Sequence, residues 1–195
     1  MDLTVNPDYW NQKYLENNMG WDTGGITTPI KNLIDKLKDK SLSILIPGAG
    51  NGYEAAYLHQ NEFENVFICE WSKQAVGNFL SSCPEFPENR IKTGDFFTIE
   101  KRYDLIIEQT FFCALPRSMR QKYVSKCSDI LKPGGKIKGL LFALEFDFQG
   151  PPHGGTKEEY KRLFSGKFNI NHMEIARDSI KPRAGNEFFI EMARK

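Results

Sequence analysis

The sequence predicts a single α/β domain with a parallel sheet, in which a strand, a glycine-rich turn and a helix form the ligand-binding unit. Three observations predict this fold. Residues 44–46 are an apolar run, glycines alternate at positions 48, 50 and 52, and a helix-compatible run follows to residue 58. The 195 residues suit one domain of ordinary size, so we expect residues 1–195 to form it.

The spacing of the glycines predicts the ligand. Gly48, Gly50 and Gly52 have no Cβ, so backbone amides can approach a ligand at the carboxyl end of the strand. A dinucleotide fingerprint would place its third glycine at position 53, which is Tyr53. The observed spacing is the one expected for the methionine half of S-adenosylmethionine. It predicts a methyltransferase with that cofactor, and the alternative is a glycine-rich turn without a ligand.

The amino-acid composition indicates the class of substrate and the cellular location of the protein. Lys and Arg number 26 against 25 Asp and Glu, with no block of one sign, which favours a small-molecule substrate over nucleic acid. The four cysteines form no C-x-x-C pair, so we expect reduced thiols, no metal site and a cytoplasmic location. No stretch of 18 apolar residues occurs, so we expect no membrane association.

Residues 1–36 precede the predicted core, residues 37–195, and contain two expected helices. The first begins at Pro7 with Asn6 as its N-cap, and the second begins at Thr28. A segment placed before the first strand can fold over the carboxyl ends of the strands, where ligands bind. We therefore expect an N-terminal helical lid.

Three aromatic residues of this segment are candidates for contact with the ligand: Trp10, Tyr14 and Trp21. The alternative is that they fill the core, because burying a large aromatic side chain contributes about 1.5–3 kcal/mol.

Two acidic residues after the glycine turn are candidates for binding the nucleoside. Glu70 ends the apolar run 66–69, where a carboxylate can accept hydrogen bonds from both ribose hydroxyls. The alternative is an exposed strand end. Asp95 and Phe96 end a short third strand, where a carboxylate would lie near the adenine amine and a ring against its face. Asp95 could equally be a turn residue.

The remaining elements follow from the same patterns. We expect a fourth strand over 103–109, a helix over 117–131, a fifth strand over 140–146, a helix opened by the capping box of Thr156 and Glu159, and terminal strands near 169–176 and 187–193. The end of the fourth strand, at Gln109, should face the transferring methyl group.

With these residues in view, the chain resembles the thiopurine S-methyltransferase family, and within it the thiol and halide methyltransferases. The markers are Tyr9-Trp10 with Tyr14, Trp21-Asp22-Thr23-Gly24, Ile46-Pro47-Gly48-Ala49-Gly50-Asn51-Gly52, Gly94-Asp95-Phe96-Phe97, Thr110-Phe111-Phe112-Cys113-Ala114, Leu131-Lys132-Pro133-Gly134-Gly135 and Gly150-Pro151-Pro152.

The resemblance implies a Rossmann-like fold with helices on both faces of a seven-stranded mixed sheet. Its strand order is 3-2-1-4-5-7-6, with the last strand antiparallel. It also implies that eight residues line the cofactor site: Trp10, Tyr14, Trp21, Gly48, Glu70, Asp95, Phe96 and Gln109.

Two positions depart from the family pattern, and both belong where the acceptor should bind. His153 follows the second proline, where halide and thiol members tend to have an aromatic residue, and Gln109 replaces Tyr or Arg. We consider both as catalytic candidates. His153 either takes a proton from the acceptor or is a solvated loop residue. The expected acceptor is a small soft nucleophile: a thiol, sulfide, halide or thiopurine-like sulfur.

Two other functions are possible from the sequence. Methylation of nucleic-acid bases commonly uses an Asp/Asn-Pro-Pro-aromatic motif after the fourth strand, but residues 108–111 read Glu-Gln-Thr-Phe and the Pro-Pro pair follows the fifth strand. A non-catalytic module that binds S-adenosylmethionine would keep the glycine turn and lose the acceptor pocket. We expect an enzyme, and a monomer.

Overall fold

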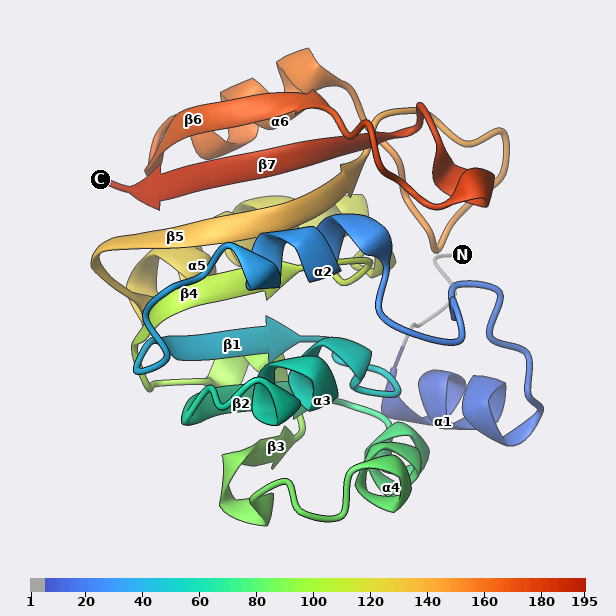
Figure 1. Cartoon of the computed structure of the whole chain (residues 1–195). Helices are drawn as coiled ribbons and strands as arrows, with labels where there is room; N and C mark the ends of the chain where they lie inside the picture. Colours follow the sequence, from blue (N-terminus) through green and yellow to red (C-terminus); the bar gives the residue numbers. More distant parts are fainter. Residues whose placement is uncertain (1–5) are drawn as a thin grey trace.

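The computed structural model describes residues 6–195 and has one seven-stranded sheet with the order β3-β2-β1-β4-β5-β7-β6 (Figure 1). The strands are β1 Ser43–Pro47, β2 Asn65–Glu70, β3 Ile91–Thr93, β4 Tyr103–Glu108, β5 Leu131–Phe142, β6 Phe168–Ile175 and β7 Glu187–Arg194. The first five strands are parallel, and β7 pairs antiparallel with both β5 and β6. The predicted strand order and the antiparallel last strand are confirmed.

The α-helices are α1 Pro7–Leu15, α2 Thr28–Asp35, α3 Tyr53–Gln60, α4 Lys73–Ser82, α5 Arg120–Ile130 and α6 Lys157–Phe164. Two predicted caps are confirmed, because Asn6 accepts from the Tyr9 amide and Thr156 from the Glu159 amide. Each cap satisfies an amide that has no partner within the helix. Within residues 6–195, no helix combines the length and the apolar character needed to cross a membrane.

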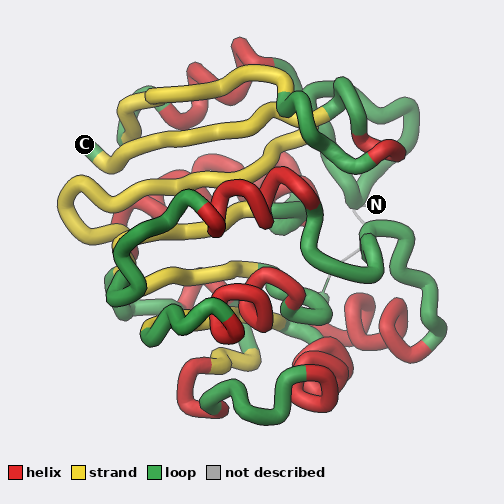
Figure 2. The backbone as a smooth tube through the Cα atoms, viewed as in Figure 1, coloured by secondary structure: helices red, strands yellow, loops and turns green. Residues whose placement is uncertain are grey.

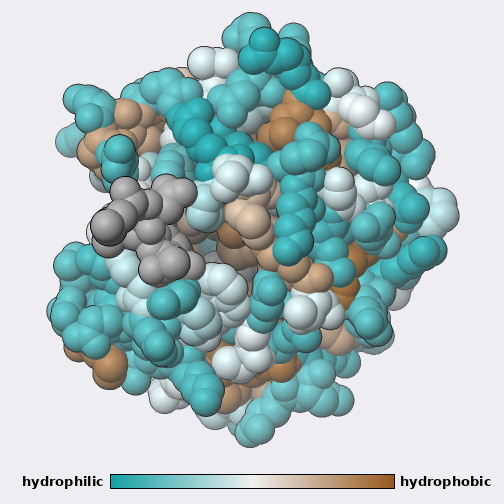
Figure 3. Space-filling view, turned by 180° about the vertical axis from the view of Figure 1, so that it is seen from behind, coloured by the Kyte–Doolittle hydropathy of each residue, from teal (hydrophilic) through white to brown (hydrophobic). Residues whose placement is uncertain are grey.

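Helices cover both faces of the sheet, as the colouring by secondary structure makes visible (Figure 2). On one face, the apolar residues of α2 and α3, such as Ile30 and Leu58, pack with Ile44 of β1. On the other, Tyr123 of α5 and Phe164 of α6 belong to a second cluster that includes the alternate residues of the strands. This second face is largely hydrophilic on its surface, with small apolar patches (Figure 3). The alternation buries β1 on both sides, as expected for a parallel sheet.

The predicted lid segment, residues 1–36, includes helix α2, whose apolar residues pack with the sheet. Ile30 and Ile34 of α2 are at most 1% exposed and lie in the same cluster as Ile44. Helix α2 therefore forms part of the core, because its apolar stripe can be buried only against the sheet. Within the described chain, residues 6–27 precede this core helix, and their role as a lid stays a prediction.

The fifth strand also differs from the expectation of 140–146. It begins at Leu131, directly after α5, and ends at Phe142. Leu131 pairs with Tyr103, and the register then shifts so that Lys136 pairs with Leu105. The Pro-Gly-Gly run at 133–135 lies in this irregularity. From sequence, residues 133–135 predict a loop. In the structure they belong to β5, where they interrupt its hydrogen bonding with β4.

Candidate cofactor and acceptor site

A cavity opens at the carboxyl ends of β1 and β4, on the side where α1 and the loops gather in Figure 1. It is lined by Tyr14, Trp21, Asp22, Thr23, Ile46, Gly48, Ala49, Gly50, Asn51, Tyr53, Glu54, Ile107, Gln109 and Thr110. The structure thus brings together five of the predicted site residues: Tyr14, Trp21, Gly48, Gly50 and Gln109. The other predicted residues, which are Trp10, Gly52, Glu70, Asp95, Phe96 and His153, lie outside this lining.

The three glycines of the turn all have positive φ, between 56° and 71°, a conformation that favours glycine. Their surroundings differ. A Cβ at Gly52 would collide with the ring of Phe79, and a Cβ at Gly50 would lie 2.8 Å from the Tyr14 hydroxyl oxygen. A Cβ at Gly48 would collide with the ring of Phe111. Gly52, the N-terminal cap of α3, and Gly48 are therefore both required by packing, and Gly48 and Gly50 also line the cavity.

Glu70 ends β2 and holds the glycine turn in place. Its carboxylate is 7% exposed and accepts 2.8 Å hydrogen bonds from the amides of Gly50 and Ser72. Burial raises the pKa of this carboxyl, and the amide donors oppose the rise. Glu70 thus joins the end of β2 to the turn after β1, at the edge where a ribose is expected.

The N-terminal segment is attached to the glycine turn through Asp22. Its carboxylate accepts hydrogen bonds from Asn51 Nδ2, from Tyr53 Oη at 3.0 Å and from the Gly24 amide at 2.7 Å. A second attachment joins α1 to α4, because Ser72 Oγ donates to Asn11 Oδ1 at 2.9 Å. These bonds hold the segment over the carboxyl ends of the strands.

The aromatic residues of the segment contact one another edge to face. The ring centroids of Trp10 and Trp21 are 5.1 Å apart, and those of Tyr14 and Trp21 are 5.8 Å apart. Trp10 therefore lies behind Trp21, although it does not line the cavity. Tyr14 is 8% exposed, so its ring both fills space and forms part of the cavity wall.

Glu108 fixes the loop after β4. It is 1% exposed, and its carboxylate accepts 2.9 Å bonds from the amides of Phe111 and Phe112 and a 2.6 Å bond from Tyr123 Oη. The loop is thereby held rigid beside the cavity. The next residue, Gln109, lines the cavity and accepts a 2.7 Å hydrogen bond from Thr27 Oγ1 through Oε1.

Asp95 and Phe96 have local roles in the described structure. Asp95 accepts a hydrogen bond from the Phe97 amide at 2.9 Å, as a turn residue does. The ring of Phe96 is 3% exposed and packs against Phe111 and Tyr123, with centroids 5.1 and 5.7 Å apart. The expectation that this ring lies against adenine is a prediction that the contacts of Phe96 do not favour.

His153 is anchored through its backbone. Its amide donates to the Cys113 carbonyl at 2.7 Å, and its carbonyl accepts from Arg120 Nη2 at 3.2 Å. These bonds join the loop that follows β5 to the loop that follows β4. The His153 side chain is half-buried, and it is not among the residues that line the cavity.

Sequence reasoning missed several residues of the cavity, among them Asp22, Asn51, Tyr53 and Glu54. The most informative is Glu54, in the first turn of α3, which is 8% exposed. Burial raises the pKa of its carboxyl to about 7. The sequence could have identified Glu54, because an acidic residue two positions after the predicted glycine turn lies at the same edge of the sheet as the turn.

The strand order, the glycine turn and the acidic end of β2 define a class of protein, the S-adenosylmethionine-dependent methyltransferases. Residues 5–192 match the family model of thiopurine S-methyltransferase. The chain belongs to the thiopurine S-methyltransferase family, and it transfers methyl groups from S-adenosylmethionine to a small molecule.

The proteins with similar sequences are named as thiopurine S-methyltransferases or as a thiol methyltransferase. The chain is 30% identical over 179 residues to thiopurine S-methyltransferase of Vibrio vulnificus, covering 82% of this chain and 81% of that protein. It is 28% identical over 159 residues to probable thiol methyltransferase 2 of Arabidopsis thaliana, covering 79% and 70%. Both alignments extend over most of each protein.

Solved structures share the fold at low identity. Magnesium protoporphyrin IX methyltransferase from Synechocystis, solved with bound S-adenosylmethionine, has a TM-score of 0.74 at 13% identity, covering 100% of both chains. A Burkholderia thailandensis N1-methyltransferase, solved with 1,6-didemethyltoxoflavin and S-adenosylhomocysteine, has a TM-score of 0.74 at 17% identity, covering 97% of this chain and 86% of that one. These similarities support the fold.

Proposed function

We propose that the methyl acceptor is a small soft nucleophile: a thiol, sulfide, halide or thiopurine-like sulfur. One observation carries this proposal. Among the described residues that line the cavity, none is Lys or Arg, and the lining includes Trp21 together with Ile107, Gln109 and Thr110 at the end of β4. Such a wall desolvates a polarisable sulfur and offers no cationic cluster for a phosphate group. The names of the sequence relatives agree with sulfur as the acceptor atom.

We propose that Trp10, Tyr14, Trp21, Gly48, Gly50, Gly52, Glu70, Asp95 and Gln109 hold the cofactor, whereas the packing of the Phe96 ring does not favour the predicted contact of Phe96 with adenine. The observed chemistry of the cavity fits the cofactor, since backbone amides of the turn and two buried carboxylates, Glu54 and Glu70, surround one edge of the sheet. When bound, the cofactor supplies an electrophilic methyl group on a sulfonium. The chain contributes alignment and exclusion of water, and alignment can supply up to about 7–11 kcal/mol.

Gln109 and His153 are the candidates for contact with the acceptor. The Oε1 atom of Gln109 is engaged by Thr27, so its Nε2 is the atom that can donate to an acceptor. His153 would either accept a thiol proton or shape the entrance. A thiol with a pKa of about 8.5 is partly ionised at pH 7, so a base assists but is not obligatory.

The proposal includes a cytoplasmic monomer that does not act on nucleic acid. The cysteines support the cytoplasmic location, because Cys69, Cys83, Cys113 and Cys127 are all free and buried. The balanced charge and the lack of Lys or Arg in the described cavity wall support a small acceptor over a polynucleotide.

An acceptor screen tests this function. Purified protein is incubated with S-adenosylmethionine and sulfide, alkyl thiols, aryl thiols, thiopurines, iodide or thiocyanate, and methylated products are detected by mass. We expect turnover with at least one sulfur acceptor. The absence of a methylated product from every one of these sulfur and halide acceptors would refute the proposal.

A further inference from the structure

The Glu54 carboxylate is a buried acid that forms no hydrogen bond or ion pair with another residue of the described chain, residues 6–195. It lines the cavity and is 8% exposed, and in the described part of the chain its only hydrogen bond comes from its own backbone amide. It makes no ion pair with a described residue. An unpaired buried carboxylate is costly, so it is either protonated or completed by a bound cation.

The nearest charged groups do not complete it. Arg183 acts on Glu54 only through space, because its guanidinium pairs with Glu187 at 3.5 Å and donates to the Trp21 carbonyl. Asp22 is a second carboxylate of the same cavity, but three donors already satisfy it. Asp22 therefore adds negative charge beside Glu54 and strengthens the need for a cation.

Two groups of the cofactor are cationic, namely its sulfonium and its α-ammonium. Only the ammonium has N–H donors, and a carboxylate forms short, strong hydrogen bonds with such a donor. The glycine spacing directs the methionine half of the cofactor to the turn, and Glu54 lies two residues after Gly52, in the first turn of α3. The amino-acid end of the cofactor and the unpartnered carboxylate thus belong to the same part of the cavity.

We propose that Glu54 binds the α-ammonium group of the methionine moiety of the cofactor. The contact is non-covalent. A proton held by Glu54 in the free protein passes to solvent when the ammonium binds. The inference rests on the cofactor-binding part of the proposed function and is independent of the acceptor, so it is tested without one.

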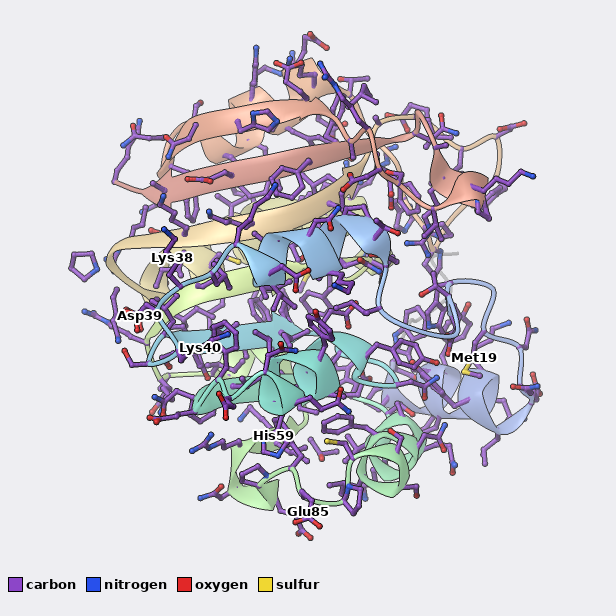
Figure 4. All side chains as sticks on the ribbon, in the orientation of Figure 1. Met19, Lys38, Asp39, Lys40, His59 and Glu85 are labelled. Carbon is purple, nitrogen blue, oxygen red and sulfur yellow. The ribbon has the colours of Figure 1, made fainter. Side chains whose placement is uncertain are left out.

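Calorimetric titration with two ligands isolates this contact. S-adenosylhomocysteine carries the ammonium, and 5′-methylthioadenosine has the same nucleoside and sulfur without the amino-acid end. We expect Glu54→Gln to weaken S-adenosylhomocysteine binding about tenfold or more while 5′-methylthioadenosine binding changes less than about threefold. The matched control is Glu85→Gln, at an exposed position in the loop after α4, remote from the cavity (Figure 4).

A second measurement needs no variant. The binding enthalpy of S-adenosylhomocysteine is measured at pH 7 in two buffers of different ionisation enthalpy, and we expect net proton release. Tyr14, Asp22 and Tyr53 are the other titratable residues that line the described cavity, and Arg183 acts on it from the turn before β7. Loss of the release in Glu54→Gln assigns the proton to Glu54.

Three results would overturn the inference. Equal losses for both ligands would mean that Glu54 only shapes the cavity. Unchanged S-adenosylhomocysteine affinity with a lower turnover of thiols would make Glu54 a base for the acceptor. If the unmodified protein bound neither ligand, the cofactor assignment itself would be wrong, a failure that the unmodified protein alone reveals.

Discussion

Arg183 Nη2 donates a 2.8 Å hydrogen bond to the backbone carbonyl of Trp21, across 162 positions of sequence. The same guanidinium pairs through Nη1 with Glu187, which is 3% exposed at the start of β7. The partly buried Arg183 guanidinium therefore joins the loop that contains Trp21 to the start of β7. The position of Trp21 in the cavity wall depends on this contact as well as on the glycine turn.

Replacing Arg183 by Met should destabilise the protein by about 1–3 kcal/mol, because the buried Glu187 carboxylate loses its charged partner. Urea unfolding measures the change. The double variant Arg183→Met with Glu187→Gln should recover part of the loss, and Lys181→Met, at an exposed position of the same turn, is the control. A single variant as stable as the unmodified protein would show that the pair contributes nothing.

Glu70→Gln should weaken S-adenosylhomocysteine binding by about 1.5–3 kcal/mol, because a charged acceptor for the ribose hydroxyls is lost. Since the Glu70 carboxylate also accepts the Gly50 and Ser72 amides, Glu70→Ala should weaken it further by releasing the turn. Calorimetric titration checks both variants, with exposed Glu64→Gln as the control. NAD should not bind. If the protein bound NAD but neither S-adenosylmethionine nor S-adenosylhomocysteine, the cofactor assignment would be refuted.

Deleting residues 1–25 should leave a folded and inactive protein. The buried clusters of the sheet begin with Ile30 of α2, which the deletion keeps. It removes Asp22 and Trp21 from the cavity wall. Thermal unfolding should remain cooperative while turnover is lost. If the cooperative transition disappears, Tyr14 and the neighbouring aromatics belong to the core and the segment is no lid.

His153→Phe distinguishes a base from a wall residue. If His153 takes the thiol proton, the rate on a weakly acidic thiol should fall, while the rate on iodide, which carries no proton, should stay unchanged or rise. Both rates are measured with saturating cofactor. Equal losses on the two acceptors would mean that His153 shapes the pocket.

The stability of the ligand-free protein should fall as the pH rises from about 4.5 to about 7, with a contribution from Glu54. Burial raises the pKa of this carboxyl to about 7 in the folded protein, so the native state holds a proton that the unfolded chain has released. Arg183 opposes the rise and Asp22 adds to it. The full contribution is about 3 kcal/mol. Urea unfolding at both pH values should show a smaller difference for Glu54→Gln, and an identical difference would contradict the assignment.

The sequence by itself determined the order of the elements and the class of protein. These features depend on residues that are close together in the sequence. The apolar run of β1, the glycine turn and the caps at Asn6 and Thr156 can therefore each be predicted from a few neighbouring residues. The strand order came from the family resemblance and is confirmed.

Only the tertiary structure decided which side chains share the cavity. Burial depends on what packs against a residue from distant parts of the chain. Phe79 determines that Gly52 serves packing, Tyr123 and Phe111 place Phe96 in the core, and the sheet makes α2 a core helix. The surroundings of Glu54 are also tertiary information. Its acidic side chain is evident from the sequence, but only the structure shows that no other described residue pairs with it, because Arg183 pairs with Glu187.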